Sequence, residues 1–192
     1  KPGDGPIISQ PRILIVAGKG SKASVIERYI APPPILPPQG GEEKCGGCYF
    51  TNAVTEIVLG EGADLDYYKL VEEGKDAFHV GTTQVWENEE SRFHSSSVTF
   101  AGELVRNNLN VSLNGEGAEC ILNGLYLVSE DRHADNTTLI DHLQPRGTSR
   151  QLYKGIARGK ASAVFSGKIL VREDAQKTDA QQINKNLLLS EQ

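Results

Sequence analysis

The chain has 192 residues, enough for one domain with a sizeable hydrophobic core. Its net charge of −5 at pH 7 argues against a general nucleic-acid binder, which would carry a basic stripe. A membrane-spanning helix needs about eighteen consecutive apolar residues, and no apolar run in the sequence is that long. The N-terminus shows no signal-peptide pattern. Because the sequence contains no Met, even at its start, we interpret it as an excised or processed piece.

Residues 1–12 read as an N-terminal arm rich in Pro and Gly, followed by expected strands at 13–17 and 24–30. Residues 31–50 then break the pattern, because five prolines within seven residues exclude both a helix and a central strand. We expect a surface loop there. The three cysteines are an odd number, so we expect no disulfide framework and a reducing compartment.

The rest of the chain consists of short β-rich runs between polar corners, which predicts an all-β fold. The runs are ILIV (13–16), VTEIVL (54–59), LNVSL (109–113) and ILNGLYLV (121–128). Residues 161–190 show the pattern most clearly: two alternating segments flank a polar corner that has neither a helix cap nor a hairpin dipeptide. This predicts a chain that coils rather than doubles back.

Regularly spaced glycines predict the length of one coil. Gly60, Gly81, Gly102 and Gly124 are separated by 21, 21 and 22 residues, and Gly167 lies 43 residues further on. The tetrapeptide GEGA also occurs twice, at 60–63 and 115–118. A period of about 20 residues without a helix predicts a β-solenoid with coils of about 21 residues. A β-sandwich or jelly roll is the alternative.

Candidate sites are few. Cys45 and Cys48 form a Cys-x-x-Cys pair that could be half of a zinc or iron–sulfur site, although it lacks a second pair. Segment 132–142 contains His133, Asp135, Asp141 and His142, but Asp141 and His142 would face opposite sides of a strand, so a structural role is favoured.

Other chemistry finds little support in the sequence. A Gly-x-Ser-x-Gly nucleophile elbow and a complete P-loop are both absent. A β-helix can also carry a polysaccharide-cleaving site built from carboxylates on adjacent coils. Asp64 with Asp66, or Asp131 with Asp135, would be the candidates for that site.

Several segments resemble the SufB/SufD family of iron–sulfur cluster assembly proteins. They are TNAVTEIVLGEGADLDYYKL (51–70), FHV (78–80), GEGAECILNGLYL (115–127), HADNTTLIDH (133–142), TSRQLYKGI (148–156) and VFSGKILVREDAQKTDAQQINKNLLLS (164–190). Their residues resemble SufD more than SufB, and the segments follow one another in the same order as in the family. The resemblance covers nearly all of 51–190, without the Pro-rich segment or Cys45 and Cys48.

The resemblance implies a right-handed parallel β-helix forming a single core domain over 1–192, without the family's N- and C-terminal helical regions. It also implies a scaffold subunit with no catalytic site of its own, which works with SufB and the ATPase SufC and forms a possible homodimer. An iron–sulfur cluster would be held transiently by the complex. The family's Asp-Asp-Val-x-Cys-x-His-Gly-Ala motif would follow Gln192, so no cluster ligand is expected in this chain.

We therefore expect a SufD-like protein of the bacterial cytoplasm or the plastid stroma, with no nucleic-acid or membrane partner. A solenoid that ends near Leu189 would leave an open end, so the chain should associate, lose order there or be part of a longer chain. The alternatives are a β-helical polysaccharide-active enzyme and a small metal-binding protein that uses Cys45 and Cys48.

Overall fold

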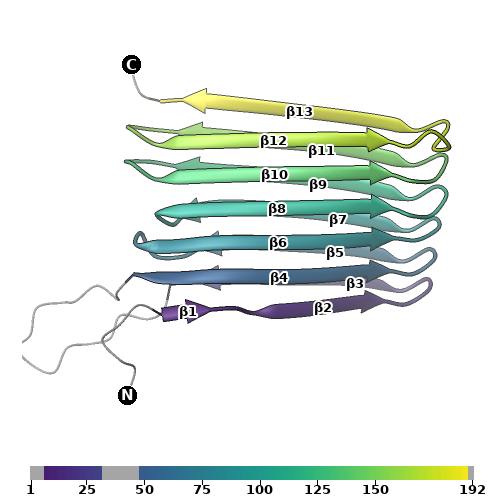
Figure 1. Ribbon diagram of the computed structural model, residues 1–192, viewed down its shortest axis with the longest axis horizontal. Coiled ribbons are helices and arrows are strands. Elements are labelled where there is room, and N and C mark those ends of the chain that lie inside the picture. The colour runs from purple at the N-terminus through teal and green to yellow at the C-terminus, as the bar shows by residue number, and fades with distance from the viewer. Residues whose placement is uncertain (1–6, 32–47, 190–192) are drawn as a thin grey trace, which may run out of the picture.

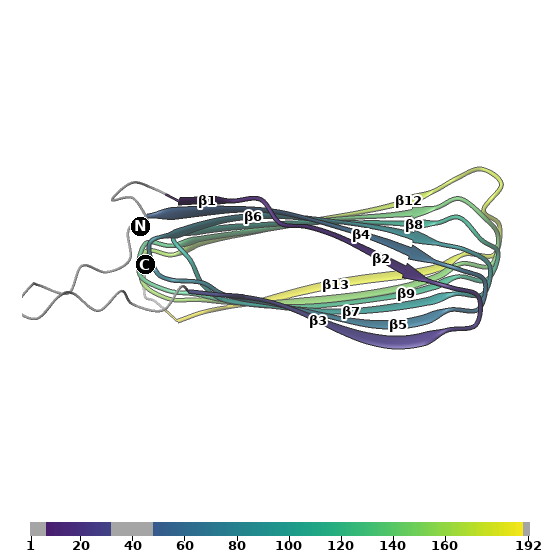
Figure 2. The same cartoon turned by 90° about the horizontal axis from the view of Figure 1, so that it is seen from below.

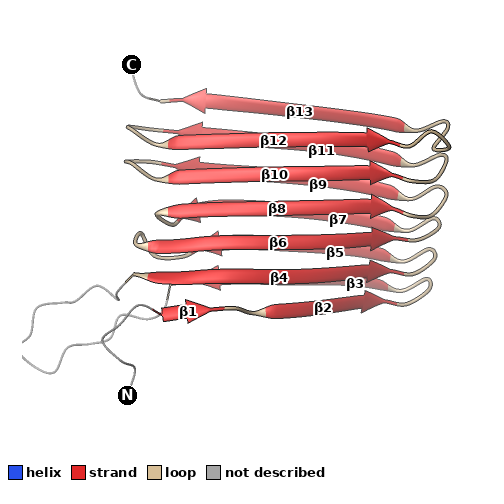
Figure 3. Cartoon of the chain, viewed as in Figure 1, coloured by secondary structure: helices blue, strands red, loops and turns tan. Residues whose placement is uncertain are grey.

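The computed structural model describes residues 7–31 and 48–189, which form thirteen β-strands and no helix (Figure 3). The sheet at the front of Figure 1, here called the front sheet, contains β1 (Ile7–Ser9), β2 (Arg12–Ala17), β4 (Tyr49–Leu59), β6 (Ala77–Glu87), β8 (Leu104–Leu113), β10 (His133–His142) and β12 (Ser162–Val171). The rear sheet contains β3 (Lys22–Ile30), β5 (Asp64–Glu72), β7 (Arg92–Ala101), β9 (Glu119–Val128), β11 (Thr148–Ala157) and β13 (Asp179–Leu188).

The chain winds between these sheets as a right-handed parallel β-helix. Every strand pair is parallel, and β4 pairs with β6 while β5, which lies between them in sequence, belongs to the other sheet. In Figure 1 the chain runs rightward at the front, returns at the rear and rises at each turn. Figure 2 shows the two sheets facing each other across the interior. The solenoid of about five turns confirms the expected fold.

The expected coil of 21 residues is wrong. Thr51 pairs with His79, 28 residues later, and the other offsets between neighbouring strands of one sheet lie between 26 and 31. The first coil is longer, because Arg12 pairs with Val54, 42 residues later. Gly60, Gly81, Gly102 and Gly124 fall alternately in corners and strands, so their spacing reflects no structural repeat.

Period-two alternation builds the core. Residues at alternating positions point inward and stack in register, as in the row Ile57, Val85, Val111 and Ile140 of the front sheet. Facing them, the rear sheet contributes Leu65, Phe93, Cys120 and Leu122, all fully buried. These apolar rows therefore bury surface against both their own sheet and the opposite one.

The corners at the right of Figure 1 share a backbone conformation. In the first five of these corners, one residue has a positive φ and its N–H donates to a carbonyl in the next coil; these residues are Gly20, Gly62, Glu90, Gly117 and Arg146. Glycine adopts this left-handed conformation without steric strain, which explains Gly62 and Gly117. Both copies of GEGA are corners of this type, and their separation of 55 residues spans two coils.

Several expected boundaries need correction. Residues 32–47 lie outside the described part of the chain, so most of the expected loop at 31–50 is not tested. Tyr49 and Phe50, however, already belong to β4, because they pair in register with Ala77 and Phe78. The N-terminal arm also contains structure, since Ile7–Ser9 forms β1 and Arg12 begins β2.

The final segment behaves as expected. β12 and β13 lie in opposite sheets, so the chain between them coils instead of forming a hairpin. Phe165 and Ile169 point inward and pack against the core. Among the described residues, β12 and β13 each have a strand neighbour on one side alone, and Leu187 and Leu188 are exposed. No helix in the described residues has the length and apolar character needed to cross a membrane.

Candidate functional site: a polar interior and an acidic groove

Of the two cysteines predicted as a metal site, one lies within the described part of the chain. Cys45 lies outside the described residues, and Cys48 is exposed immediately before β4. Cys120 is fully buried on β9. Within residues 7–31 and 48–189, no three His, Cys, Asp or Glu side chains come together as metal ligands. The metal site at Cys45 and Cys48 therefore stays a prediction.

The polar segment around β10 is divided between two faces of its strand, as expected. His142 points into the core, where its Nε2 lies 3.0 Å from Ser149 Oγ. Asp141 points outward and accepts two hydrogen bonds from Arg172, at 2.9 and 2.8 Å. Asp135 also faces outward, 3.6 Å from Arg106. These pairs fasten β10 to its neighbours and leave no shared metal site.

The first coils enclose charged groups, which the sequence reasoning missed. Glu27 on β3 is 7% exposed, and its carboxylate accepts hydrogen bonds from the hydroxyls of Tyr29, Tyr67 and Thr55. Burial, with the Glu27 carboxylate next in importance, raises the pKa of Tyr29 and of Tyr67. Both phenols therefore remain donors to this carboxylate at neutral pH.

A second buried carboxylate, Glu73, directly follows β5. Glu73 is 4% exposed, and its Oε1 accepts a 2.7 Å hydrogen bond from Thr51 Oγ1. Its Oε2 lies 3.2 Å from Nδ1 of His79, which is fully buried on β6. The Tyr29 ring packs edge-on against the His79 imidazole at 4.6 Å. Glu27 and Glu73 thus each have donors of their own.

Lys69 is the cation of this interior. Its side chain on β5 is buried, and its Nζ lies 5.6 Å from the centre of the Tyr29 ring. Among the described residues, no carboxylate oxygen lies within 4.0 Å of that Nζ. Burial lowers the pKa of Lys69 to about 8, although Glu27 and Glu73 act in the opposite direction.

A small cavity adjoins Lys69. It encloses about 20 Å³, room for about one water molecule, and its walls include Lys69, Thr83, Ser95, Ser97 and Asn107. The neighbouring Gly81 leaves the space open, because a Cβ there would overlap Lys69 Nζ and lie 2.9 Å from His79 Nε2. His79 Nε2 and Asn107 Oδ1 have no hydrogen-bond partner in the described chain, which fits a site for ordered water.

A second buried polar group lies at the opposite end of the coils. Glu87 on β6 is fully buried, and burial raises the pKa of its carboxyl well above the usual range. Burial, followed by the effect of Glu87, likewise raises the pKa of the Cys120 thiol. The raised pKa keeps the Cys120 thiol protonated at neutral pH, and a protonated thiol is a poor nucleophile and metal ligand.

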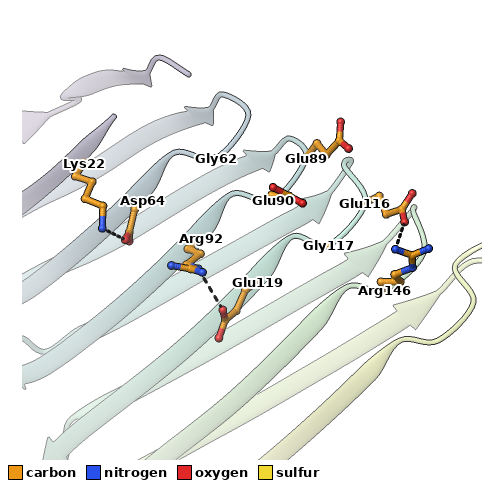
Figure 4. A pocket seen from close by; sticks show the side chains of 10 residues that line it. All are labelled: Lys22, Gly62, Asp64, Glu89, Glu90, Arg92, Glu116, Gly117, Glu119 and Arg146. Carbon is orange, nitrogen blue, oxygen red and sulfur yellow. Dashed lines mark ion pairs between the residues drawn. The ribbon is translucent and has the colours of Figure 1, made fainter. Parts of the chain in front are cut away.

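An acidic groove runs along the corners on the right of Figure 1. It encloses about 700 Å³, and Figure 4 shows its side chains. Three carboxylates in it are paired with cations: Asp64 with Lys22 at 3.3 Å, Glu119 with Arg92 at 3.6 Å, and Glu116 with Arg146 at 3.0 Å. The groove brings carboxylates from successive coils together, as the polysaccharide hypothesis requires. It includes Asp64 but not Asp66, which lies 3.4 Å from His94.

Comparison with known proteins decides the family. The family model described as "SUF system FeS cluster assembly, SufBD core domain" matches residues 3–192. The chain belongs to the SufBD family. It is 34% identical over 185 residues to an iron–sulfur cluster assembly SufBD family protein of Synechocystis, with 96% of this chain and 40% of the relative aligned.

Two further relatives match most of the chain. Protein ABCI7, chloroplastic, of Arabidopsis thaliana is 31% identical over 185 residues, which cover 95% of this chain and 36% of that protein. Iron-sulfur cluster assembly protein SufD of Escherichia coli is 30% identical over 171 residues, covering 89% of this chain and 38% of SufD. The chain thus spans about two fifths of the length of these relatives.

Proposed function

We propose that this chain is the β-helical core domain of a SufD-like scaffold subunit in iron–sulfur cluster assembly, working with a SufB-like subunit and a SufC-like ATPase. The supporting observation is the family match over residues 3–192 together with the SufD and ABCI7 relatives. The stacked parallel coils fit this role, because a scaffold needs a rigid body to hold partners and ligands in place. The subunit acts without a catalytic site of its own, in the cytoplasm or the plastid stroma.

The test uses the full-length protein that contains this chain. It is tagged and co-expressed with the SufB-like and SufC-like proteins of the same organism, and the purified material is assayed for both subunits. We expect both to be retained, and iron and sulfide to be found in the complex. Failure to retain either subunit would contradict the proposal. A tagged SufC-like protein expressed without this subunit controls for direct association between the other two proteins.

The cluster is cargo of the complex in this proposal, and Cys45 and Cys48 are not its ligands. A Cys45→Ser, Cys48→Ser double variant should therefore keep the metal content of the parent. Loss of bound zinc or iron in the double variant, with unchanged retention of the partner subunits, would instead favour a separate metal site at this pair.

The acidic groove keeps polysaccharide cleavage as a second candidate, since it contains carboxylates from adjacent coils. Three of those carboxylates already face a cation at 3.0–3.6 Å. We expect no release of reducing ends from a panel of acidic and neutral polysaccharides. Release that disappears in Glu116→Gln and persists in the exposed control Glu130→Gln would establish the enzyme.

A further inference from the structure

Both sheets carry exposed apolar side chains on their outer faces, among them Phe78 and Val164 on the front sheet. The middle of the front sheet presents polar side chains in register, among them Thr82, Asn108 and Thr137. The rear sheet presents apolar side chains on four consecutive strands, β7, β9, β11 and β13. We call these the rear patch: Val98, Phe100, Leu125, Leu127, Ile156 and Leu187.

Five of the six members of the rear patch stack in register. Val98 lies opposite Leu125, and Leu127, Ile156 and Leu187 form one row across three strands. Phe100 and Leu187 are 44% and 54% exposed. Four neighbouring strands span about 14 Å, and residues two apart along a strand lie about 7 Å from each other. These dimensions match one face of a short α-helix that crosses the strands.

Two lysines border the rear patch. Lys154 on β11 and Lys185 on β13 are exposed and directly opposite each other, in the row that continues from Val98 and Leu125. Neither makes an ion pair with another described residue. Like charges in directly opposite positions destabilise a sheet. Elsewhere on the rear sheet, Lys22 and Arg92 instead face Asp64 and Glu119 across the ladder.

We propose that the rear patch is a docking surface for an amphipathic helix of a partner protein, with carboxylates beside its apolar stripe. Lys154 and Lys185 are about 5 Å apart across the ladder, and side chains one helical turn apart are separated by about 6 Å. Two acidic residues at positions i and i+4 can therefore pair with both lysines. The same helix then covers Leu127, Ile156 and Leu187 with its apolar stripe.

The probe is a fluorescent synthetic helix of about 18 residues, long enough to fold, with leucines along one face and glutamates beside them. A twin peptide carries lysines in place of the glutamates. Binding to the full 192-residue chain is measured by fluorescence anisotropy. We expect the glutamate peptide to bind and the lysine twin to bind roughly tenfold more weakly, because two attractions become repulsions. A Lys154→Glu, Lys185→Glu variant should reverse this preference.

Matched variants distinguish binding at the rear patch from nonspecific hydrophobic binding. Ile156→Ser should weaken binding of the glutamate peptide roughly tenfold, because it removes buried apolar area from the contact. Val164→Ser, an equally outward position that is 43% exposed on β12 of the front sheet, should leave binding unchanged. Equal binding of both peptides, or equal loss in both variants, overturns the proposal. Light scattering that shows a dimer dissociated by Ile156→Ser also overturns it, because a second copy would then occupy the patch.

The variants need a check of folding, for which thermal melts suffice. If Ile156→Ser does not fold, the Lys154→Glu, Lys185→Glu variant still decides the outcome, since both lysines are exposed. The assay contains no SUF subunit. Its failure therefore leaves the proposed scaffold function intact, and failure of the co-purification leaves the docking surface intact.

Discussion

The buried ammonium group of Lys69 has an unusual environment for a lysine. It lies inside the solenoid, beside the Tyr29 ring and a water-sized cavity, with Glu27 and Glu73 nearby but no close ion pair among the described residues. Burial disfavours its charged form more than the two carboxylates favour it. The folded chain therefore holds this proton less tightly than the unfolded chain does.

That difference predicts how stability depends on pH. The pKa of Lys69 is about 8 when folded, against 10.5 for an ordinary lysine. Between these values the unfolded state binds the extra proton, so the free energy of unfolding rises with pH, by up to about 3 kcal/mol. Below pH 8 the penalty is fully present. Urea unfolding of the parent and of Lys69→Met from pH 7.5 to 10.5 should show the parent gaining stability relative to the variant.

The control for this titration is Lys168→Met, because Lys168 is exposed on β12. Its stability should follow that of the parent at every pH. Taking differences between proteins removes most of the contribution of the tyrosines that titrate in the same range. Parallel curves for the parent and Lys69→Met would show that Lys69 titrates as an ordinary lysine.

The cysteines should differ sharply in reactivity. Cys48 is exposed, whereas Cys120 is fully buried and its thiol pKa is raised by burial and then by Glu87. Because the thiolate is the reactive form, a maleimide should label one thiol of the native Cys45→Ser variant and a second one only after unfolding. Peptide mapping identifies the labelled residue. Labelling of Cys120 at the same rate as Cys48 in the native protein would contradict the buried environment.

At the scale of single elements, the corners limit what the chain tolerates. Gly115 lies against the preceding coil, and a Cβ there would overlap the backbone of Glu89. A backbone neighbour cannot move aside as a flexible side chain can. Gly115→Ala should therefore lower the free energy of unfolding by about 1–3 kcal/mol, measured by urea unfolding. Gly18→Ala is the matched control, because its Cβ would meet nothing within 4 Å. Similar losses in both variants would contradict this account of the corner.

The strands and corners also show which features of the fold could be predicted from the sequence. Alternation alone correctly predicts the strand at 162–171, because its inward positions carry Phe165 and Ile169. The coil length was missed because glycines in corners and glycines inside strands look alike in a sequence. The informative signal was the repeat of GEGA after 55 residues, since both copies are equivalent corners two coils apart.

The polar interior was missed for a different reason. Lys69 occupies the inward phase of β5, between Tyr67 and Val71, so the alternation already placed it inside. A core predicted from apolar residues alone leaves out a lysine at such a position. Glu27, which lies opposite Lys69 in the strand ladder, comes from β3, and the pairing of β3 with β5 depends on a coil lengthened to 42 residues. Long-range register of this kind is set by packing rather than by local pattern.

At the scale of the whole molecule, stability should vary along the solenoid axis. A solenoid coil is stabilised by the coils on both sides, so an end coil receives about half of that support. The burial patterns reflect this: alternate residues are buried along β6 and β10, whereas every residue of β1 and nearly every residue of β13 is exposed. The end coils should open locally far more often than the middle coils.

Hydrogen–deuterium exchange followed by mass spectrometry can measure this gradient. We expect peptides from β6 to β10 to remain protected longest, and peptides from β1 and β13 to exchange first, because the ladder hydrogen bonds of an end strand are shared with one neighbour rather than two. The same measurement on the full-length protein is the control, since further chain or a partner packed on β13 should slow exchange there and leave the middle coils unchanged. Uniform protection along the axis in the isolated chain would contradict the nearest-neighbour account and would mean that the whole solenoid opens as a single cooperative unit.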